Sequence, residues 1–342
     1  MKMQKFKLLS FNSFQKPLMA NDVENEYKYE RNNYFIENEL DKFDIVVLQE
    51  QFCTINPRPV LLLEKAEARG FKYFHKTKDP AFSGKFWGNG GLVTLSKYPI
   101  VDADEISFEH SVAIDKLLEK GVVWTKVLLP NGKHIHLFNT HILAFYHGQS
   151  YHDDMWCKIK CVRQMVHTRQ FIKEKLAKHY SKGDLAMICG DFNLNGRNNT
   201  FVGADILQYF ELDKELTSRM KVERNELHFY QHLLNYNNGL FKLENVIYKD
   251  YEEYPVTMGN YTVSETGEKV PMDSVLTQLG ERFDYACLDH IFEIKVKGNT
   301  ENQEIRIVDG SSKVEEFFVS DQLFTQLSDH YGLSLDIVYR TK

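Results

Sequence analysis

The sequence lacks long apolar runs, an excess of positive charge and a clear cysteine framework, and each absence excludes a class of protein. No stretch of about 18 consecutive apolar residues occurs, so we expect no membrane-spanning helix. The N-terminal segment MKMQKFKLLSFNSF has basic residues but neither the apolar core nor the small-residue cleavage site of a signal peptide. These absences predict a protein that is cytoplasmic or bound peripherally to a membrane.

The balance of charge and the cysteines point away from two further classes. Acidic residues outnumber basic ones by 48 to 42, and nonspecific nucleic-acid binding relies on clustered positive charge, so we expect no specific nucleic-acid partner. Five scattered cysteines favour reduced thiols over a disulfide framework. Cys157 and Cys161 lie four residues apart on a predicted helix, where packing is expected because two further metal ligands are lacking. No feature indicates a protein partner.

Hydrophobic periodicity predicts a chain in which strands and helices are interspersed. Helices are expected at 27–42, 61–69, 153–180 and 223–235. Strands are expected at 6–12, 44–50, 91–100, 121–129, 134–141, 185–193, 287–294, 304–309, 314–319 and 333–339, and most of 205–280 is expected to be loop. Since no change in composition marks a linker, residues 1–342 are expected to form a single domain with a layered mixed α/β structure.

The segment MICGDFNLNG, residues 187–196, combines a buried strand with two polar side chains at its end. Asp191 and Asn193 are two residues apart, and positions two apart on a strand point to the same side. Two oxygen-bearing groups aimed at one place predict that something polar and charged binds there.

Other predicted strands also end, or begin, beside polar residues. These are Asn12, Glu50, His141, Asp191, Asn193, Asp289, Asp329 and His330. Each alone has a structural explanation: Asn12 could cap a turn, Glu50 could pair with a surface lysine, and His141 could be a buried structural histidine. In a layered α/β fold the loops at one end of a sheet form the binding crevice. Carboxylates, amides and imidazoles gathered there suit Mg²⁺ and a phosphate group.

Seven motifs, in order, resemble those of the endonuclease/exonuclease/phosphatase superfamily, which has the DNase-I-like fold. They are SFNSF (10–14), LQE (48–50), GGLVTLSKYPI (90–100), NTH (139–141), GDFN (190–193), LDHIF (288–292) and SDH (328–330). The resemblance implies a four-layer α/β sandwich of two packed mixed β-sheets flanked by helices. It also implies metal-dependent hydrolysis of a phosphate ester, with Mn²⁺ or Co²⁺ as substitutes for Mg²⁺.

The resemblance also implies roles for individual residues. Glu50 is expected to be the main metal ligand, with Asn12 beside it and Asp329 close to the metal. His330 is expected to be the general base, oriented by Asp289. Asp191 and Asn193 are expected to position the nucleophile and the phosphate, and Asp191 is also a candidate for proton transfer. His141 is expected to donate a hydrogen bond to a phosphate oxygen.

The segment NTHILAFY, residues 139–146, is similar to the neutral sphingomyelinase branch, as is KGVVWTKV, residues 120–127. This branch implies phospholipase-C-type cleavage of sphingomyelin to ceramide and phosphocholine. His290 stands where the family usually has Tyr, and Phe14 stands where Trp is common. Alternatives are a superfamily nuclease or inositol-phosphate phosphatase, or a non-catalytic binding protein of the same fold.

A lipid substrate requires contact with a membrane surface, and aromatic residues could provide it. Candidates, each of which could instead pack in the core, are Phe82, Phe86, Trp87, Phe145, Tyr146 and Tyr151. The stretch SGKFWGNGG lacks the spacing of a phosphate-binding P-loop. His134 and His136 could form a zinc pair, but surface positions are expected for both.

Overall fold

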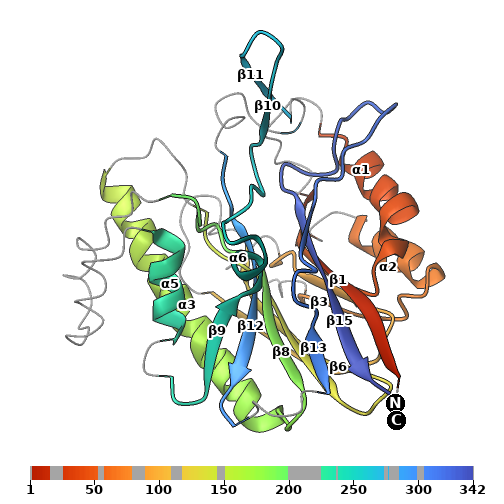
Figure 1. The fold of residues 1–342 in the computed structure, drawn as a ribbon, viewed down its shortest axis with the longest axis vertical. Helices are drawn as coiled ribbons and strands as arrows, with labels where there is room; N and C mark the ends of the chain where they lie inside the picture. The colour runs from red at the N-terminus through yellow and green to blue at the C-terminus, as the bar shows by residue number, and fades with distance from the viewer. Residues whose placement is uncertain are drawn as a thin grey trace.

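The fold consists of two β-sheets packed face to face with helices on both outer faces (Figure 1). The computed structural model describes residues 2–15, 26–52, 58–78, 89–108, 118–144, 151–198, 225–235, 238–272, 276, 285–298 and 304–341. Cys53, Phe82, Phe86, Trp87, Phe145, Tyr146 and the side chain of Tyr151 lie outside the described residues.

The first sheet has seven strands in the order β13-β15-β1-β2-β4-β3, with β14 also paired to β15, within the described residues. Its strands are β1 (Met3–Gln15), β2 (Ile45–Gln51), β3 (Tyr73–Lys76), β4 (Val93–Ser96), β13 (Ile305–Ile307), β14 (Lys313–Glu315) and β15 (Gly332–Arg340). Strands β1 and β2 are parallel, whereas β15 runs antiparallel to β1.

The second sheet has six strands in the order β5-β6-β7-β8-β12-β9, again within the described residues. Its strands are β5 (Ile100–Ser107), β6 (Gly121–Leu128), β7 (His134–His141), β8 (Leu185–Asp191), β9 (Phe241–Asn245) and β12 (Asp289–Val296). A separate hairpin joins β10 (Tyr261–Val263) to β11 (Lys269–Pro271).

Helices cover the outer face of each sheet. Helices α1 (Lys28–Tyr34) and α2 (Arg58–Ala68) lie against the first sheet, and α1 continues into a π-helical and a 3₁₀ turn through Lys42. Helices α3 (Tyr151–His179) and α5 (Glu226–Asn235) lie against the second, and the short α6 (Val246–Tyr251) follows β9. No helix in the described part of the chain is both long and apolar enough to cross a bilayer.

The strands read as continuous apolar runs because both of their faces are covered. In β1, Leu8 points into the core between the two sheets, and the next residue, Leu9, points into the core under α1 and α2. In β8, Met187 faces the inter-sheet core and Ile188 faces α3. The predicted four-layer α/β sandwich is therefore confirmed.

Three details differ from the sequence-based expectations. The predicted strand 91–100 is divided, because a turn after β4 sends the chain to β5 in the other sheet. The segment expected to be loop contains β9, α6 and the β10–β11 hairpin. His136 was expected at the surface but is fully buried, and its Nε2 lies 3.2 Å from Asp184 Oδ2.

Candidate functional site

The polar residues predicted from the sequence meet at one end of the two sheets. The carboxyl ends of the parallel pairs β1–β2 and β7–β8 lie there, and the antiparallel β12 and β15 begin there. His141 and Asp289 are the register partners of Asp191 on its two sides. Residues from position 12 to position 330 are thereby brought to one place.

Asn12 links a carboxylate of the first sheet, Glu50, to a carboxylate of the second sheet, Asp191. Its amide Nδ2 donates to Glu50 Oε1 at 3.2 Å and to Asp191 Oδ2 at 2.9 Å. His141 Nε2 lies 3.4 Å from the same Asp191 oxygen and 4.0 Å from Glu50 Oε1. Glu50, His141 and Asp191 therefore form a group whose ligand atoms lie within 4.8 Å of one another.

His330 and Asp289 form the second half of the site. His330 Nδ1 lies 2.8 Å from Asp289 Oδ2, so the imidazole donates through Nδ1 and presents Nε2 to the site. That Nε2 lies 3.8 Å from Asp191 Oδ2. Asp191 thus belongs to both groups, and all three side chains are almost fully buried.

Burial and charge shift the pKa values of this second half. Burial raises the pKa of Asp191 to about 6, although the neighbouring His330 and Lys120 act to lower it. Burial acts to lower the pKa of His330, but the carboxylates of Asp289 and Asp191 outweigh it and hold that pKa well above its ordinary value. The buried carboxylates therefore favour the protonated form of His330, while burial favours the protonated form of Asp191.

Two residues of the candidate site, Glu50 and Asn193, have unusual backbone geometry. Glu50 has φ 61° and Asn193 has φ 50°, in the left-handed region that residues other than glycine rarely adopt. Such strain persists where the surrounding structure enforces it, typically at functional sites. Gly190 has φ 144°, and a Cβ there would lie 2.0 Å from the carbonyl oxygen of Thr140, so the GDFN motif requires glycine at this position.

Asn193 reaches the site by a different route from the one expected. Strand β8 ends at Asp191, so strand alternation does not orient Asn193. Its backbone N–H donates to Asp191 Oδ1 at 2.8 Å, and its Nδ2 donates to the carbonyl of Ile142 at 3.0 Å. The pair lies together because of this turn, not because of a continuing strand.

Asp329 lies beside the site but outside both three-residue groups found among the described residues. Its Oδ1 lies 3.2 Å from Ser328 Oγ. The predicted chemical role of each of these residues stays a prediction, whereas their convergence is an observation.

The donor set fits a divalent metal ion. In the described part of the chain Glu50 Oε2 and Asp289 Oδ1 are buried without a hydrogen-bond partner. A buried carboxylate oxygen without a partner is costly unless a cation or a donor satisfies it. Carboxylate and amide oxygens are the ligands that hard divalent cations prefer. Glu50 is the residue placed to hold such an ion through its partnerless Oε2, whereas Asn12 directs its Nδ2 at Glu50 and Asp191 and uses its Oδ1 to accept from the backbone N–H of Phe14.

Sequence reasoning passed over several residues that support the site. Asn139 of the NTH motif reaches across to the first sheet: its Nδ2 donates to the carbonyls of Leu48 and Val93, and its Oδ1 accepts from Gln49 at 2.7 Å. A polar side chain inside an apolar strand was the available signal. Thr257 accepts from the backbone N–H of Asp289 at 3.2 Å and lies in no recognisable motif.

Lys120 is a further residue near the site for which the sequence had predicted no role. It is buried, and its Nζ donates to the carbonyl of Ile142, the same oxygen that accepts from Asn193. Its charge acts on Asp191. A buried cation at this position can stabilise negative charge on a substrate.

His290 is buried as a neutral imidazole. Its Nε2 donates to the carbonyl of Leu194 at 3.0 Å, and its Nδ1 lies 3.5 Å from the Asn245 amide nitrogen. Burial lowers the pKa of His290 to about 4. Because the unfolded chain takes up this proton near pH 6.5, the free energy of unfolding is expected to fall as the pH drops from 6.5 to 4, by on the order of 3 kcal/mol.

The His290 contribution can be isolated with His290→Gln, which keeps an amide donor for Leu194 but does not titrate. The variant is expected to lose less stability than the wild type between pH 6.5 and pH 4, measured by urea unfolding at several pH values. Equal pH slopes for the two proteins would contradict this assignment.

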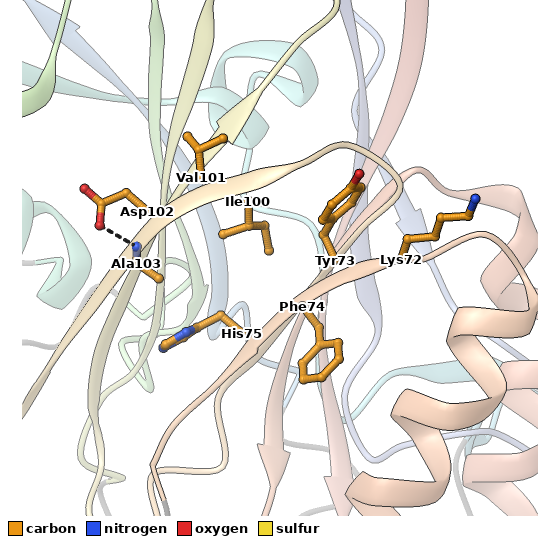
Figure 2. A pocket seen from close by; sticks show the side chains of 8 residues that line it. All are labelled: Lys72, Tyr73, Phe74, His75, Ile100, Val101, Asp102 and Ala103. Carbon is orange, nitrogen blue, oxygen red and sulfur yellow. Dashed lines mark hydrogen bonds between the residues drawn. The ribbon is translucent and has the colours of Figure 1, made fainter.

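A cavity of about 360 Å³ lies elsewhere, between β3 and β5 at the edges of the two sheets. Figure 2 shows its lining residues, which include Tyr73, His75 and Asp102. None of the predicted site residues lines it, and neither metal-binding group found in the described residues is there. The chemistry is therefore assigned to the convergence of Asn12, Glu50, His141, Asp191, Asp289 and His330.

Comparison with known proteins gives a curated relative that covers most of the chain. A search of protein-family models found no match. A sphingomyelinase of Dictyostelium discoideum is 30% identical over 344 residues, which cover 86% of this chain and 71% of that protein.

Among the solved structures that share the fold are two bacterial proteins. Sphingomyelinase C from Streptomyces griseocarneus matches with a TM-score of 0.60 and 17% identity, covering 97% of this chain and 99% of that one. Beta toxin from Staphylococcus aureus, as a mutant with bound magnesium ions, matches with a TM-score of 0.58 and 19% identity, covering 99% of this chain and 100% of that one.

Proposed function

The chain belongs to the sphingomyelinase branch of the DNase-I-like superfamily, and on this premise we propose that it is a Mg²⁺-dependent phosphodiesterase that cleaves sphingomyelin to ceramide and phosphocholine. The observation that carries the proposal is the Asp289–His330–Asp191 arrangement beside Glu50 and Asn12. We propose that residues 1–342 act as one catalytic domain.

His330 is assigned the role of general base for hydrolysis. Asp289 holds Nδ1–H and leaves Nε2 facing the site, where it can take a proton from water. The water oxygen forms a bond to phosphorus, and the bond from phosphorus to the ceramide oxygen breaks. The ceramide oxygen takes up a proton, and Asp191, whose pKa burial raises, is the proposed donor.

Charge neutralisation is the other requirement, because phosphoryl transfer depends on positioning and on neutralising negative charge. His141 and Lys120 are the cationic or donor groups of the chain placed to act on phosphate oxygens. Glu50 would hold Mg²⁺, with Asn12 fixing the Glu50 carboxylate through its Nδ2 and with Asp329 close by; the ion would supply polarisation of the phosphate and favour the neutral form of His330. Magnesium ions in the beta toxin structure support this choice of metal.

The rival functions have less support. A nuclease of this fold would be expected to surround the crevice with basic residues, whereas this chain has net charge −6. A binding protein that kept only the fold would have no need of the oriented His330–Asp289 pair or the partnerless Glu50 oxygen. An inositol-phosphate phosphatase would differ from the proposed enzyme in its substrate, which the following panel measures.

A substrate panel tests the proposal. Purified protein with Mg²⁺ is expected to release phosphocholine from sphingomyelin in mixed micelles, and a chelator is expected to stop the release. Plasmid DNA and inositol phosphates are expected to remain intact. Hydrolysis of those two alone would refute the proposed substrate and leave the proposed mechanism of phosphate-ester hydrolysis standing.

We further propose that the protein meets its lipid at a membrane surface, on the end that carries the site. The β10–β11 hairpin projects beyond the end of the sheets at which β12 and β15 begin (Figure 1). Val263 on this hairpin is 63% exposed. Leu323 is 73% exposed, in the loop that leads to Asp329 and His330. The loop is anchored by the buried Phe324, so Leu323 is presented on a fixed support.

Replacing Leu323 with Asp is expected to lower activity on sphingomyelin vesicles by about tenfold, since an inserted leucine contributes roughly 1.5–3 kcal/mol. Activity on a short-chain sphingomyelin below its micelle concentration is expected to stay unchanged. Val166→Asp provides the control, because Val166 is an exposed apolar residue of α3. Equal loss on both substrates would show that Leu323 does not act through the membrane.

A further inference from the structure

Arg31, on α1, is a charged side chain buried beneath the site. Only 1% of it is exposed. Its guanidinium makes four hydrogen bonds to backbone carbonyls: Nε donates to Glu26 at 2.6 Å, Nη1 to Ser13 at 3.1 Å and to Leu327 at 2.5 Å, and Nη2 to Phe14 at 2.7 Å. None of these four acceptors is a carboxylate, although a buried guanidinium usually pairs with one.

Three of the four bonded carbonyls, those of Ser13, Phe14 and Leu327, belong to the two segments that carry Asn12 and His330. Ser13 and Phe14 directly follow Asn12 at the end of β1. Leu327 directly precedes Ser328, Asp329 and His330. Nη1 alone bridges the two segments, because it donates to both Ser13 and Leu327.

Ser328 completes the connection between these segments. Its hydroxyl donates to the carbonyl of Asn12 at 2.7 Å and accepts from the backbone N–H of His330 at 3.1 Å. Movement of the Leu327 carbonyl would therefore move Ser328, and with it both the backbone of Asn12 and the imidazole of His330. The positions of Asn12 and His330 therefore both depend on the hydrogen bonds of Ser328.

The positive charge of Arg31 also interacts with nearby carboxylates. Burial lowers its pKa to about 10, against the neighbouring carboxylates of Asp329, Glu26 and Glu50, which raise it. The side chain is a cation at neutral pH, and its charge interacts with these carboxylates although it is buried. It can offset part of their mutual repulsion without occupying the place of a substrate or metal.

We propose that Arg31 is a positioning residue, which holds the end of β1 and the segment before His330 in the register that the proposed hydrolysis requires. The inference rests on the proposed function of the site. The planar guanidinium is needed because it directs several donors in fixed directions at once, whereas a lysine ammonium at the same place is a point donor on a flexible stem.

The test compares Arg31→Lys and Arg31→Ala with Arg169→Lys and Arg169→Ala. Arg169, on α3, donates to the carbonyl of Leu233 on α5, so the control loses a similar bond between helices remote from the site. Arg31→Lys is expected to lower kcat on short-chain sphingomyelin by about 10²-fold with KM changed less than threefold, since small misplacements of reacting groups have effects of this size. Arg169→Lys is expected to keep kcat within twofold.

Two further readouts separate positioning from general destabilisation. Guanidinium ion at low millimolar concentration is expected to raise kcat of Arg31→Ala several-fold and to leave Arg169→Ala unchanged. The proton resonance of His330 Nδ1–H is expected to shift in Arg31→Lys and not in Arg169→Lys, whether or not the protein cleaves sphingomyelin. Wild-type kcat and an unshifted resonance in Arg31→Lys would overturn the inference. Absence of activity in the wild type with the shift present would refute only the proposed function.

Discussion

Replacing His330 with Ala is expected to lower kcat for sphingomyelin hydrolysis by about 10³–10⁴-fold, the range at the upper end for loss of a general base. Nothing else in the described site presents an imidazole nitrogen oriented in the same way by a buried carboxylate. KM is expected to change little, because His330 acts on the water and not on the lipid. The measurement is phosphocholine release under saturating substrate, alongside circular dichroism to verify the fold.

A matched histidine variant provides the control for His330→Ala. His179 lies at the end of α3, near the opposite end of β8 from Asp191, where its Nδ1 is 3.5 Å from Asp102 Oδ2. His179→Ala is expected to keep kcat within about twofold, as is usual for a residue remote from the chemistry. A His330→Ala protein that folds and retains more than a tenth of wild-type kcat would remove His330 from the proposed mechanism.

The second large effect is expected for Glu50→Gln, which keeps the shape of the side chain and removes its charge. The apparent affinity for Mg²⁺ is expected to fall about 10²-fold or more, with kcat falling as well, because the carboxylate is the main proposed ligand. Without metal the variant is expected to be as stable as the wild type or more so, since Glu50 Oε2 is buried without a hydrogen-bond partner in the described structure.

The opposite signs of these effects make the Glu50 prediction specific. Thermal unfolding is measured for both proteins in chelator and in excess Mg²⁺. The wild type is expected to gain stability on adding Mg²⁺, because a ligand that binds only the folded state stabilises it. Glu50→Gln is expected to gain little. A variant that is destabilised in chelator, yet is stabilised by Mg²⁺ as strongly as the wild type, would assign Glu50 a structural role.

Much of the fold was predictable from hydrophobic pattern. Strands such as β2 and β8 are apolar on both faces, and this pattern predicts burial between layers. The pattern failed at 91–100, where β4 and β5 are each short and the turn between them carries the chain from one sheet to the other. It also failed in 205–280, where the edge strand β9 and the hairpin are partly exposed and therefore polar in sequence.

The site was predictable in part because strand ends that carry polar residues are visible in the sequence. Asn12, Glu50 and Asp191 stand out against the apolar strands that precede them. Residues that act through the backbone leave no such mark. Arg31 lies on a polar helix, and its role depends on which carbonyls the fold brings to it, as the separation of 296 residues between Arg31 and Leu327 illustrates.

Hydrolysis in H₂¹⁸O tests most directly whether these side chains aim water at phosphorus. Purified protein with Mg²⁺ is incubated with sphingomyelin in labelled water, and both products are analysed by mass spectrometry. One ¹⁸O atom is expected in the phosphate group of phosphocholine and none in ceramide. Label in ceramide, or phosphocholine without label, would contradict attack of water on phosphorus at this site.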